Sequence, residues 1–231
     1  MTPPPLALRN VTIRYEANAP TILGDVSFTV ADSERVALVG LNGSGKTTLL
    51  MAAVGLAPHE GQIEICGIPL SRKTLTAVRD RIGFLFNVPE DQLLFPKVID
   101  DVAFGLLRRG MPSTEATAKA LATLRSLGVG HLAEASLHHL SHGQKQRIAL
   151  AGALACEPPL LLLDEPSAAL DPPGKRSLAR LLLQQGAAMV VATHDLEFGA
   201  RLCTRFIMLE SGRIVVDSTD AREILHRWEQ D

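Results

Sequence analysis

A glycine-rich stretch, GLNGSGKTT, connects an apolar strand-like run, VALVG, to a helix-like run that begins at Lys46. It matches the pattern G-x-x-x-x-G-K-[ST], in which backbone N–H groups and the positive end of a helix dipole surround a phosphate. Lys46 is expected to reach the β- and γ-phosphates, and Thr47 to ligate Mg²⁺. A simple glycine turn beside a lysine is the alternative, but the flanking strand and helix favour nucleotide binding. The predicted ATP-binding residues in this stretch are Gly40, Leu41, Asn42, Gly43, Ser44, Gly45, Lys46, Thr47 and Thr48.

Strand-like and helix-like runs alternate along the rest of the chain. Helical patterns dominate from about residue 89 to 155, and one helix there is predicted with Ser113 as its N-cap and Gly128 as its stop. Ser211 and Gly212 indicate a hairpin between two later strands. This order predicts an α/β fold in which an α-helical insert interrupts a core with a parallel sheet. The predicted strands lie within residues 6–15, 26–40, 61–68, 82–86, 160–164, 188–194 and 205–210.

Composition bounds the classes of protein that fit. With 46% hydrophobic residues, a chain of 231 residues can bury one substantial core. The formal charge of −2 argues against general binding to nucleic acid. Cys66, Cys156 and Cys203 lack Cys-x-x-Cys spacing, so we expect neither a disulfide framework nor a zinc site, and a reducing cytosol fits best. The sequence shows no signal-peptide pattern and no apolar run of about 20 residues, so no membrane-crossing segment is expected.

Two acids follow the apolar run PLLLL. Asp164 and Glu165 would stand at the carboxyl end of a buried strand, beside the phosphate-binding loop. Asp164 is expected to hold Mg²⁺ through water, and Glu165 to orient and deprotonate the water that attacks the γ-phosphate. Two acids after a strand can also form a solvated turn, but the glycine loop in the same chain favours the catalytic interpretation.

The segment HLSHGQKQRIALAGALA indicates a second anion-binding helix terminus. Ser141 and Gln144 form the Ser-x-x-Gln capping box that begins a helix with a small apolar face. The Ser141 hydroxyl, the Gly143 N–H and the helix dipole form an anion site more than ninety residues from the first. We therefore predict that each site acts across a dimer interface, with ATP enclosed between the glycine loop of one subunit and the Ser141 helix of another.

With these motifs in this order, the sequence resembles the nucleotide-binding domain of ABC transporters over nearly its whole length. LSHGQ is similar to the LSGGQ signature, SAALD to the D-loop, and ATHD to the segment of the switch histidine. The resemblance implies that His194 contacts the γ-phosphate and the attacking water, and that Tyr15 stacks on adenine. The resemblance also implies that five residues contact the ATP bound by the other subunit of a dimer: Ser141, His142, Gly143, Gln144 and Asp171.

The same resemblance implies a domain organisation. Residues 1–231 would form a single ABC ATPase domain of the P-loop NTPase, RecA-like class, with an N-terminal antiparallel β part. The nucleotide-binding core and β part would take up about 1–88 and 156–231, and the helical subdomain about 89–155.

The segment FNVPEDQLLFPKVIDDVAFGL is similar to FQNPDDQLF...DVAFG in energy-coupling factor importers, especially their cobalt and nickel group. The resemblance implies that residues 89–95 form a short helix that docks on the basic coupling helices of a transmembrane subunit. Glu90, Asp91 and Gln92 would belong to this coupling helix, with Glu90 and Asp91 supplying charge. A solvated turn followed by core residues is the alternative. The apolar contacts would come from Leu93, Leu94 and Phe95.

Two residues depart from the family's motifs. Asn87 stands where the Q-loop has glutamine and is shorter by one methylene. Either a water bridges its amide oxygen to Mg²⁺ or the loop moves inward to restore direct contact, and we expect the bridging water because it is the smaller change. His142 replaces a signature glycine and cannot adopt every backbone conformation open to glycine. Ser141 and Gly143 are retained, which leaves the expected γ-phosphate contacts available.

The sequence therefore predicts the ATP-hydrolysing subunit of an energy-coupling factor importer on the cytoplasmic face of the membrane. Its cofactors would be ATP and Mg²⁺, and its partners a transmembrane coupling subunit and a second copy or a related ATPase, without nucleic acid. The cargo would be a small substrate such as cobalt or nickel ion or a vitamin. One alternative is a soluble ABC-type ATPase acting in translation or DNA repair, although such proteins usually carry two domains or a long coiled coil. The other is a regulator without turnover, against which Lys46, Asp164, Glu165 and His194 argue.

Overall fold

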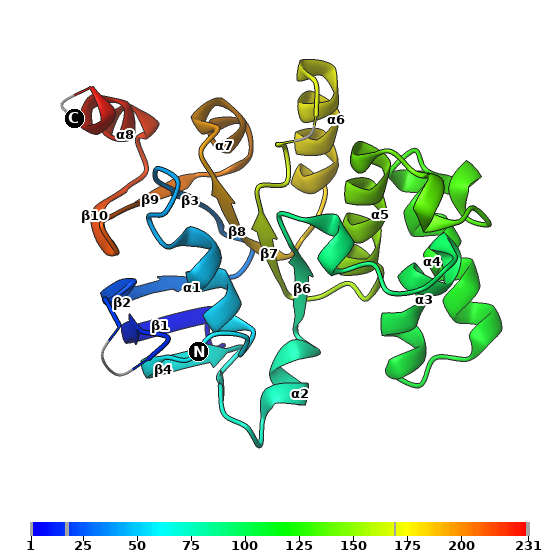
Figure 1. Ribbon diagram of the computed structural model, residues 1–231, viewed down its shortest axis with the longest axis horizontal. Coiled ribbons are helices and arrows are strands. Elements are labelled where there is room, and N and C mark those ends of the chain that lie inside the picture. The colour runs from blue at the N-terminus through cyan, green and yellow to red at the C-terminus, as the bar shows by residue number, and fades with distance from the viewer. Residues whose placement is uncertain (1, 17–18, 169, 230–231) are drawn as a thin grey trace.

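The strands of the protein form two sheets (Figure 1) in a computed structural model that describes residues 2–16, 19–168 and 170–229. The smaller sheet is antiparallel, with the order β2-β1-β4-β5. The larger sheet has the order β10-β9-β3-β8-β7-β6, and its neighbours are parallel except for the β9–β10 hairpin. The strands are β1 (Leu6–Ile13), β2 (Leu23–Val30), β3 (Arg35–Val39), β4 (Glu60–Ile65), β5 (Ile68–Pro69), β6 (Ile82–Leu85), β7 (Leu160–Asp164), β8 (Ala188–Thr193), β9 (Arg205–Glu210) and β10 (Arg213–Ser218).

Three helices between β6 and β7 gather at one end of the molecule (Figure 1) and form the predicted α-helical insert. They are α3, α4 and α5; a single turn of 3₁₀-helix, η1, lies between β6 and α3, and two more, η2 and η3, lie between α4 and α5. The helices are α1 (Lys46–Ala53), α2 (Leu75–Arg79), α3 (Val98–Arg108), α4 (Ser113–Ser126), α5 (His142–Ala155), α6 (Pro172–Leu183), α7 (Leu196–Leu202) and α8 (Ala221–Trp228), with η1 (Pro89–Asp91), η2 (Gly130–Leu132) and η3 (Leu137–His139).

The helix α1 lies between the two sheets (Figure 1). Its Leu49 and Leu50 are 1% exposed and share one hydrophobic core with β1, β2 and β4 of the small sheet and with β3, β7 and β8 of the large one. A second core on the other face of the large sheet contains residues of α3 to α7. Because apolar surfaces surround α1, its sequence KTTLLMAA needs no polar face along its length.

The register of the large sheet brings separate motifs to one edge. Val39 of β3 pairs with Thr193 of β8, and Asp164 of β7 pairs with Ala192 of β8. Parallel strands place their carboxyl ends on the same side, and ligands bind in the crevice outside those ends. The glycine loop after β3, the acids at the end of β7 and His194 after β8 therefore meet at this edge.

Two local predictions are wrong. Ser113 is not the N-cap of α4, because Pro112 takes that position with an extended backbone (φ −56°, ψ 141°) and Ser113 is the first helical residue. Residues 89–95 do not form one helix, because the 3₁₀ turn ends at Asp91. The backbone N–H groups of Leu94 and Phe95 instead donate to Asp101 Oδ1, at 2.7 and 3.0 Å, and this carboxylate holds the chain out of a helical path.

Candidate nucleotide-binding and hydrolysis site

The glycine loop has a backbone shape that other residues do not readily take. Gly43 and Gly45 have φ of 83° and 101°, in the left-handed region, and Gly45 is the N-cap of α1. A Cβ on Gly45 would lie 2.5 Å from a Leu23 side-chain carbon, and one on Gly40 would lie 2.3 Å from the Leu209 carbonyl oxygen. The loop is therefore fixed by sterics as well as by conformation, with the N-terminus of α1 at its end.

Lys46 is buried beneath this loop. Its ammonium donates to the backbone carbonyls of Gly40 at 2.8 Å and Leu41 at 3.1 Å. Burial lowers its pKa, while the nearby carboxylates of Glu165 and Asp164 act in the opposite direction. The positively charged ammonium group of Lys46 thus lies against the inner side of the loop, where it could neutralise the charge of a bound phosphate.

Asp164 is a buried carboxylate with an incomplete set of partners. It is 1% exposed, and among the described residues its Oδ1 has no hydrogen-bond partner. Burial raises its pKa to about 6; the neighbouring Glu165 charge adds to this, whereas Thr47 and Lys46 lower it. A buried oxygen without a partner is costly unless a cation or donor completes it. Together with the adjacent Thr47 hydroxyl, this donor set suits a hard cation with oxygen ligands such as Mg²⁺.

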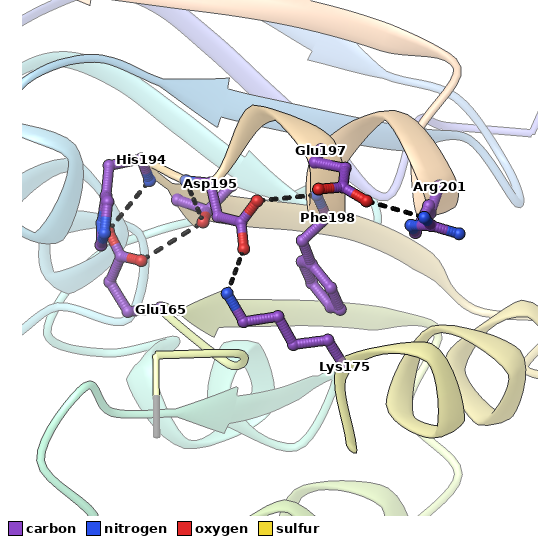
Figure 2. Close-up of polar contacts among 8 residues, drawn as sticks. Glu165, Lys175, His194, Asp195, Glu197, Phe198 and Arg201 are labelled. Carbon is purple, nitrogen blue, oxygen red and sulfur yellow. Dashed lines mark hydrogen bonds and ion pairs between the residues drawn. The ribbon is translucent and has the colours of Figure 1, made fainter. Parts of the chain in front are cut away.

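Glu165 and His194 are in direct contact (Figure 2). Glu165 Oε1 lies 2.9 Å from His194 Nδ1 and accepts from the His194 backbone N–H at 3.2 Å, while Oε2 accepts from the Thr193 hydroxyl at 3.3 Å. The Glu165 side chain is 16% exposed and that of His194 is 58% exposed. The carboxylate is therefore oriented by three groups of β8 and its following turn, and the imidazole faces solvent beside it.

The helix α5 begins as the sequence predicts. Ser141 Oγ accepts from the Gln144 backbone N–H at 3.3 Å, and Gln144 Oε1 accepts from the Ser141 backbone N–H at 2.8 Å, which completes the capping box. His142 has a helical backbone and does not have a positive φ, so its side chain costs no strain in place of glycine. Ser141 and His142 are exposed; among the described residues, Ser141 Oγ is bonded to Gln144 and His142 Nδ1 lies 3.7 Å from Glu90.

Three other site residues proposed from the sequence, Tyr15, Asn87 and Asp171, follow β1 or β6 or precede α6. Tyr15, two residues after β1, is 56% exposed, and Asn87, two residues after β6, is also exposed. Asp171 caps α6, because its Oδ1 accepts from the Gly174 N–H at 2.8 Å. The D-loop segment 167–171 includes residue 169, which is outside the described residues.

The predicted coupling residues are more engaged within the chain than the sequence suggests. Glu90 accepts from Lys145 Nζ at 2.9 Å and lies 3.7 Å from His142 Nδ1, and this bond to Lys145 lowers the pKa of Glu90. The Gln92 amide is turned inward, where it accepts from the Phe86 N–H and donates to the Ala149 carbonyl. Asp91 is exposed. Glu90 and Gln92 are thus held by contacts within the chain.

Three side chains that sequence reasoning missed support the site. Lys175 of α6 pairs with Asp195 at 2.5 Å, and Asp195 caps α7 directly after His194 (Figure 2). Gln146 of α5 donates to the Glu165 carbonyl. Only Asp195 carries a sequence signal, because an aspartate before a helix-like run is a favourable N-cap.

The fold and this edge of the sheet define a P-loop nucleoside triphosphatase. The family model for ABC transporters matches residues 23–168. Because that match spans more than half of the chain, the chain belongs to the ABC transporter ATP-binding family, and it is an ABC-type ATPase. Within the part of the chain that the structure describes, none of the helices is both long and apolar enough to cross a bilayer.

Relatives in this family cover most of the chain. A putative ABC transporter ATP-binding protein of Gloeobacter violaceus is 44% identical over 217 residues, which are 92% of this chain and 88% of that protein. The energy-coupling factor transporter ATP-binding protein EcfA of Methanothermobacter thermautotrophicus is 34% identical over 220 residues, 93% of this chain and 70% of that protein. Among solved structures, cbiO1 from Clostridium perfringens, part of the ABC transporter complex cbiONQ, has a TM-score of 0.84 at 31% identity and covers 99% of this chain and 93% of its own.

A second solved structure bears on activity. A dimeric ATP-binding cassette in a post-hydrolysis state with ADP and Pi has a TM-score of 0.84 and 30% identity, and covers 92% of this chain and 97% of its own. The chain is therefore an ATP-binding member of a family of transporter ATPases.

Proposed function

We propose that the chain is the ATP-hydrolysing subunit of an energy-coupling factor importer, and that two ATPase subunits enclose ATP between them. The observation that carries this proposal is the exposed capping box at Ser141. It adds a second helix N-terminus that suits an anion, on a different helix from the glycine loop. One nucleotide bound to one chain has no use for both termini, whereas a dimer uses each in the partner's site.

In each composite site, the residues of this chain would have separate roles. Lys46 and the N–H groups of the glycine loop would bind the phosphates, and Tyr15 would stack on the base. Glu165, oriented by Thr193 and His194, would hold and deprotonate the attacking water. From the partner, Ser141, Gly143 and Asp171 would approach the γ-phosphate.

Mg²⁺ fits the residues present. Thr47 and Asp164 would hold it, and Asn87 would contribute through a bridging water, since its side chain is one methylene shorter than glutamine. The ion supplies charge neutralisation for the phosphate oxygens when it is bound. The unpartnered Asp164 Oδ1 is the feature of this chain that supports it.

A groove beside η1 supports docking to a membrane partner. The groove has a volume of about 290 Å³ and lies between η1, η3 and α5. Leu94, one of its lining residues, is 76% exposed. We define the docking groove as its lining residues Glu90, Leu93, Leu94, Phe95, Pro96, Leu137, His138 and Lys145. Since Glu90 already binds Lys145, apolar contact with a coupling helix would dominate, and Asp91 would supply the charge.

The likeness to EcfA and to cbiO1 of the cbiONQ complex supports an importer on the cytoplasmic face of the membrane. Its cargo would be a small substrate, such as cobalt or nickel ion or a vitamin, and the ATPase would not contact it. A soluble ATPase acting in translation or DNA repair has no support from these relatives.

Mixed dimers test the composite site. A Lys46→Ala chain mixed with a Ser141→Arg chain should regain ATPase activity above either variant alone, because each heterodimer holds one site free of both changes. Absence of complementation at every mixing ratio would contradict sharing across the interface. Copurification with a transmembrane subunit, lost in Leu94→Asp, tests the importer assignment.

A further inference from the structure

Gln146 is a buried polar side chain at the contact between α5 and the acids that follow β7. It is 3% exposed, and its Nε2 donates to the Glu165 backbone carbonyl at 3.1 Å. Its Oε1 has no partner among the described residues, and Gln146 lines a cavity of about 230 Å³ together with residues that include Pro166 and Leu170. Burying an amide oxygen without a hydrogen-bond partner lowers the stability of the fold. We therefore expect a functional reason for the bond from Gln146 Nε2 to Glu165.

The bond from Gln146 is made to a residue with a strained backbone conformation. Glu165 has φ of 48°, in the left-handed region, which costs a residue with a Cβ about 1–2 kcal/mol. Three hydrogen bonds hold this backbone: the Glu165 N–H donates to the Ala192 carbonyl at 2.9 Å, and the Glu165 carbonyl accepts from the Ala168 N–H at 3.2 Å and from Gln146 Nε2 at 3.1 Å. The first comes from β8 of the core and the second from the turn that follows Glu165, whereas only the Gln146 bond among these three comes from the insert.

Gln146 stands five residues after Ser141, in the first turns of the same helix. The capping box fixes Ser141 to this helix, and the following Ile148 and Ala149 are fully buried. A helix held in this way moves as one rigid piece. A shift of Ser141 toward a phosphate would therefore move the Gln146 amide relative to the Glu165 carbonyl.

We propose that Gln146 is a positioning residue that links the two ATP sites of the dimer. Through Ser141, α5 senses the nucleotide held by the partner, and through Gln146 it fixes the backbone of Glu165 in its own chain. ATP in one site thus raises the rate of hydrolysis in the other without being required for it. This inference rests on the proposed dimeric function and adds to it a route of communication within each chain.

The test compares Gln146→Met with Gln185→Met in the full-length chain. Methionine has nearly the shape of glutamine but no amide donor. Gln185, two residues after α6, is the matched control, because its Nε2 also donates to a backbone carbonyl, that of Leu181 in the last turn of α6. Gln146→Met should lower kcat on the order of tenfold to a hundredfold, since a misplaced catalytic group costs this much, and KM should stay within about twofold. Its Hill coefficient for ATP should fall to about 1 from a higher wild-type value.

A second variant separates positioning from packing. Gln146→Glu places a carboxyl at the same point, and burial against a carbonyl oxygen raises the pKa of that carboxyl. Only its protonated form can donate to Glu165. Its kcat relative to wild type should therefore rise as the pH falls from 8 to 6, whereas the ratio for Gln146→Met should stay flat.

ATP-induced dimerisation supplies the final comparison. In a Glu165→Gln background, adding Gln146→Met should leave the ATP concentration needed for dimerisation unchanged, because the phosphate contacts are intact. Wild-type kcat and Hill coefficient in Gln146→Met would overturn the inference, as would a lower kcat with the Hill coefficient unchanged or a loss of dimerisation. If the wild-type chain neither hydrolyses ATP nor dimerises with it, the proposed function itself is wrong.

Discussion

The Asp195 carboxylate is expected to stabilise the fold by about 2 kcal/mol at neutral pH. Its Oδ1 accepts from the Phe198 N–H at 2.9 Å as the cap of α7, a bond worth about 1 kcal/mol. Its Oδ2 accepts from Lys175 Nζ at 2.5 Å, and the two side chains are 19% and 33% exposed (Figure 2). Solvent screening at that exposure limits the ion pair to about 1 kcal/mol. Asp195→Ala should lose both, and Asp195→Asn, which keeps an oxygen for the cap, should lose about 1 kcal/mol.

The pH dependence of this effect has a definite sign. Burial raises the pKa of Asp195, but the bonds from Lys175 and the Phe198 N–H outweigh it, so the pKa in the fold lies below the ordinary value. The folded chain therefore binds this proton less tightly than the unfolded chain does. The stabilisation is fully present above the unfolded value of about 3.9 and is lost as the pH falls through the folded pKa. The stability gap between wild type and Asp195→Asn should narrow below about pH 4.

Urea unfolding at pH 7, 5 and 3.5 measures these differences. A double-mutant cycle of Asp195→Asn with Lys175→Met isolates the pair, and should give a coupling energy near 1 kcal/mol at pH 7. The control is the pair Glu197–Arg201 at 2.7 Å, whose side chains are 79% and 48% exposed, so that its coupling should be near 0.3 kcal/mol. A coupling for Asp195–Lys175 no larger than the control, or a gap that widens at low pH, would refute the reasoning.

Three further predictions follow from the site and the docking groove. Glu165→Gln should lower kcat by about 10²- to 10⁴-fold while leaving an ATP-bound dimer detectable by light scattering, because the site keeps its shape and loses its base; near-normal phosphate release would remove Glu165 from the mechanism. Gly45→Ala should weaken ATP binding in calorimetry, because the φ of 101° strains a residue with a Cβ and that Cβ would lie 2.5 Å from a Leu23 side-chain carbon; unchanged affinity would contradict a fixed loop. Leu94→Asp should lower capture by a membrane partner at least tenfold, about 1.4 kcal/mol, while Leu56→Asp, at a residue 51% exposed outside the groove, should not; equal capture would discount apolar docking.

The strand-end motifs could be placed from the sequence because each follows an apolar strand of a parallel sheet. Such a sheet forces Asp164 and His194 to one edge whatever the loops between them do. The capping box was equally predictable, since Ser141 and Gln144 are three residues apart on one turn. Local chemistry and strand direction fixed these positions without any knowledge of side-chain packing.

The supporting contacts could not be predicted in this way. Gln146 meets Glu165 across 19 residues, Lys175 meets Asp195 across 20, and Lys145 meets Glu90 across 55. Each depends on how two separate elements pack, and no periodic pattern encodes that. The predicted helix at 89–95 failed for the same reason, because Asp101 reaches back from α3 to bind the backbone N–H groups of residues 94 and 95.

The parallel pairing of β6 with β7 has a geometric consequence for assembly. Since the two strands run in the same direction, the chain leaves β6 at the carboxyl edge of the sheet and must travel back to the amino edge before it enters β7. The helix α5 makes that return, so its first residues stand on the side where the glycine loop opens. Both complementary surfaces of one subunit thus point the same way. In the proposed dimer, one two-fold rotation would satisfy both surfaces at once, so the assembly would close at two chains instead of growing into a filament.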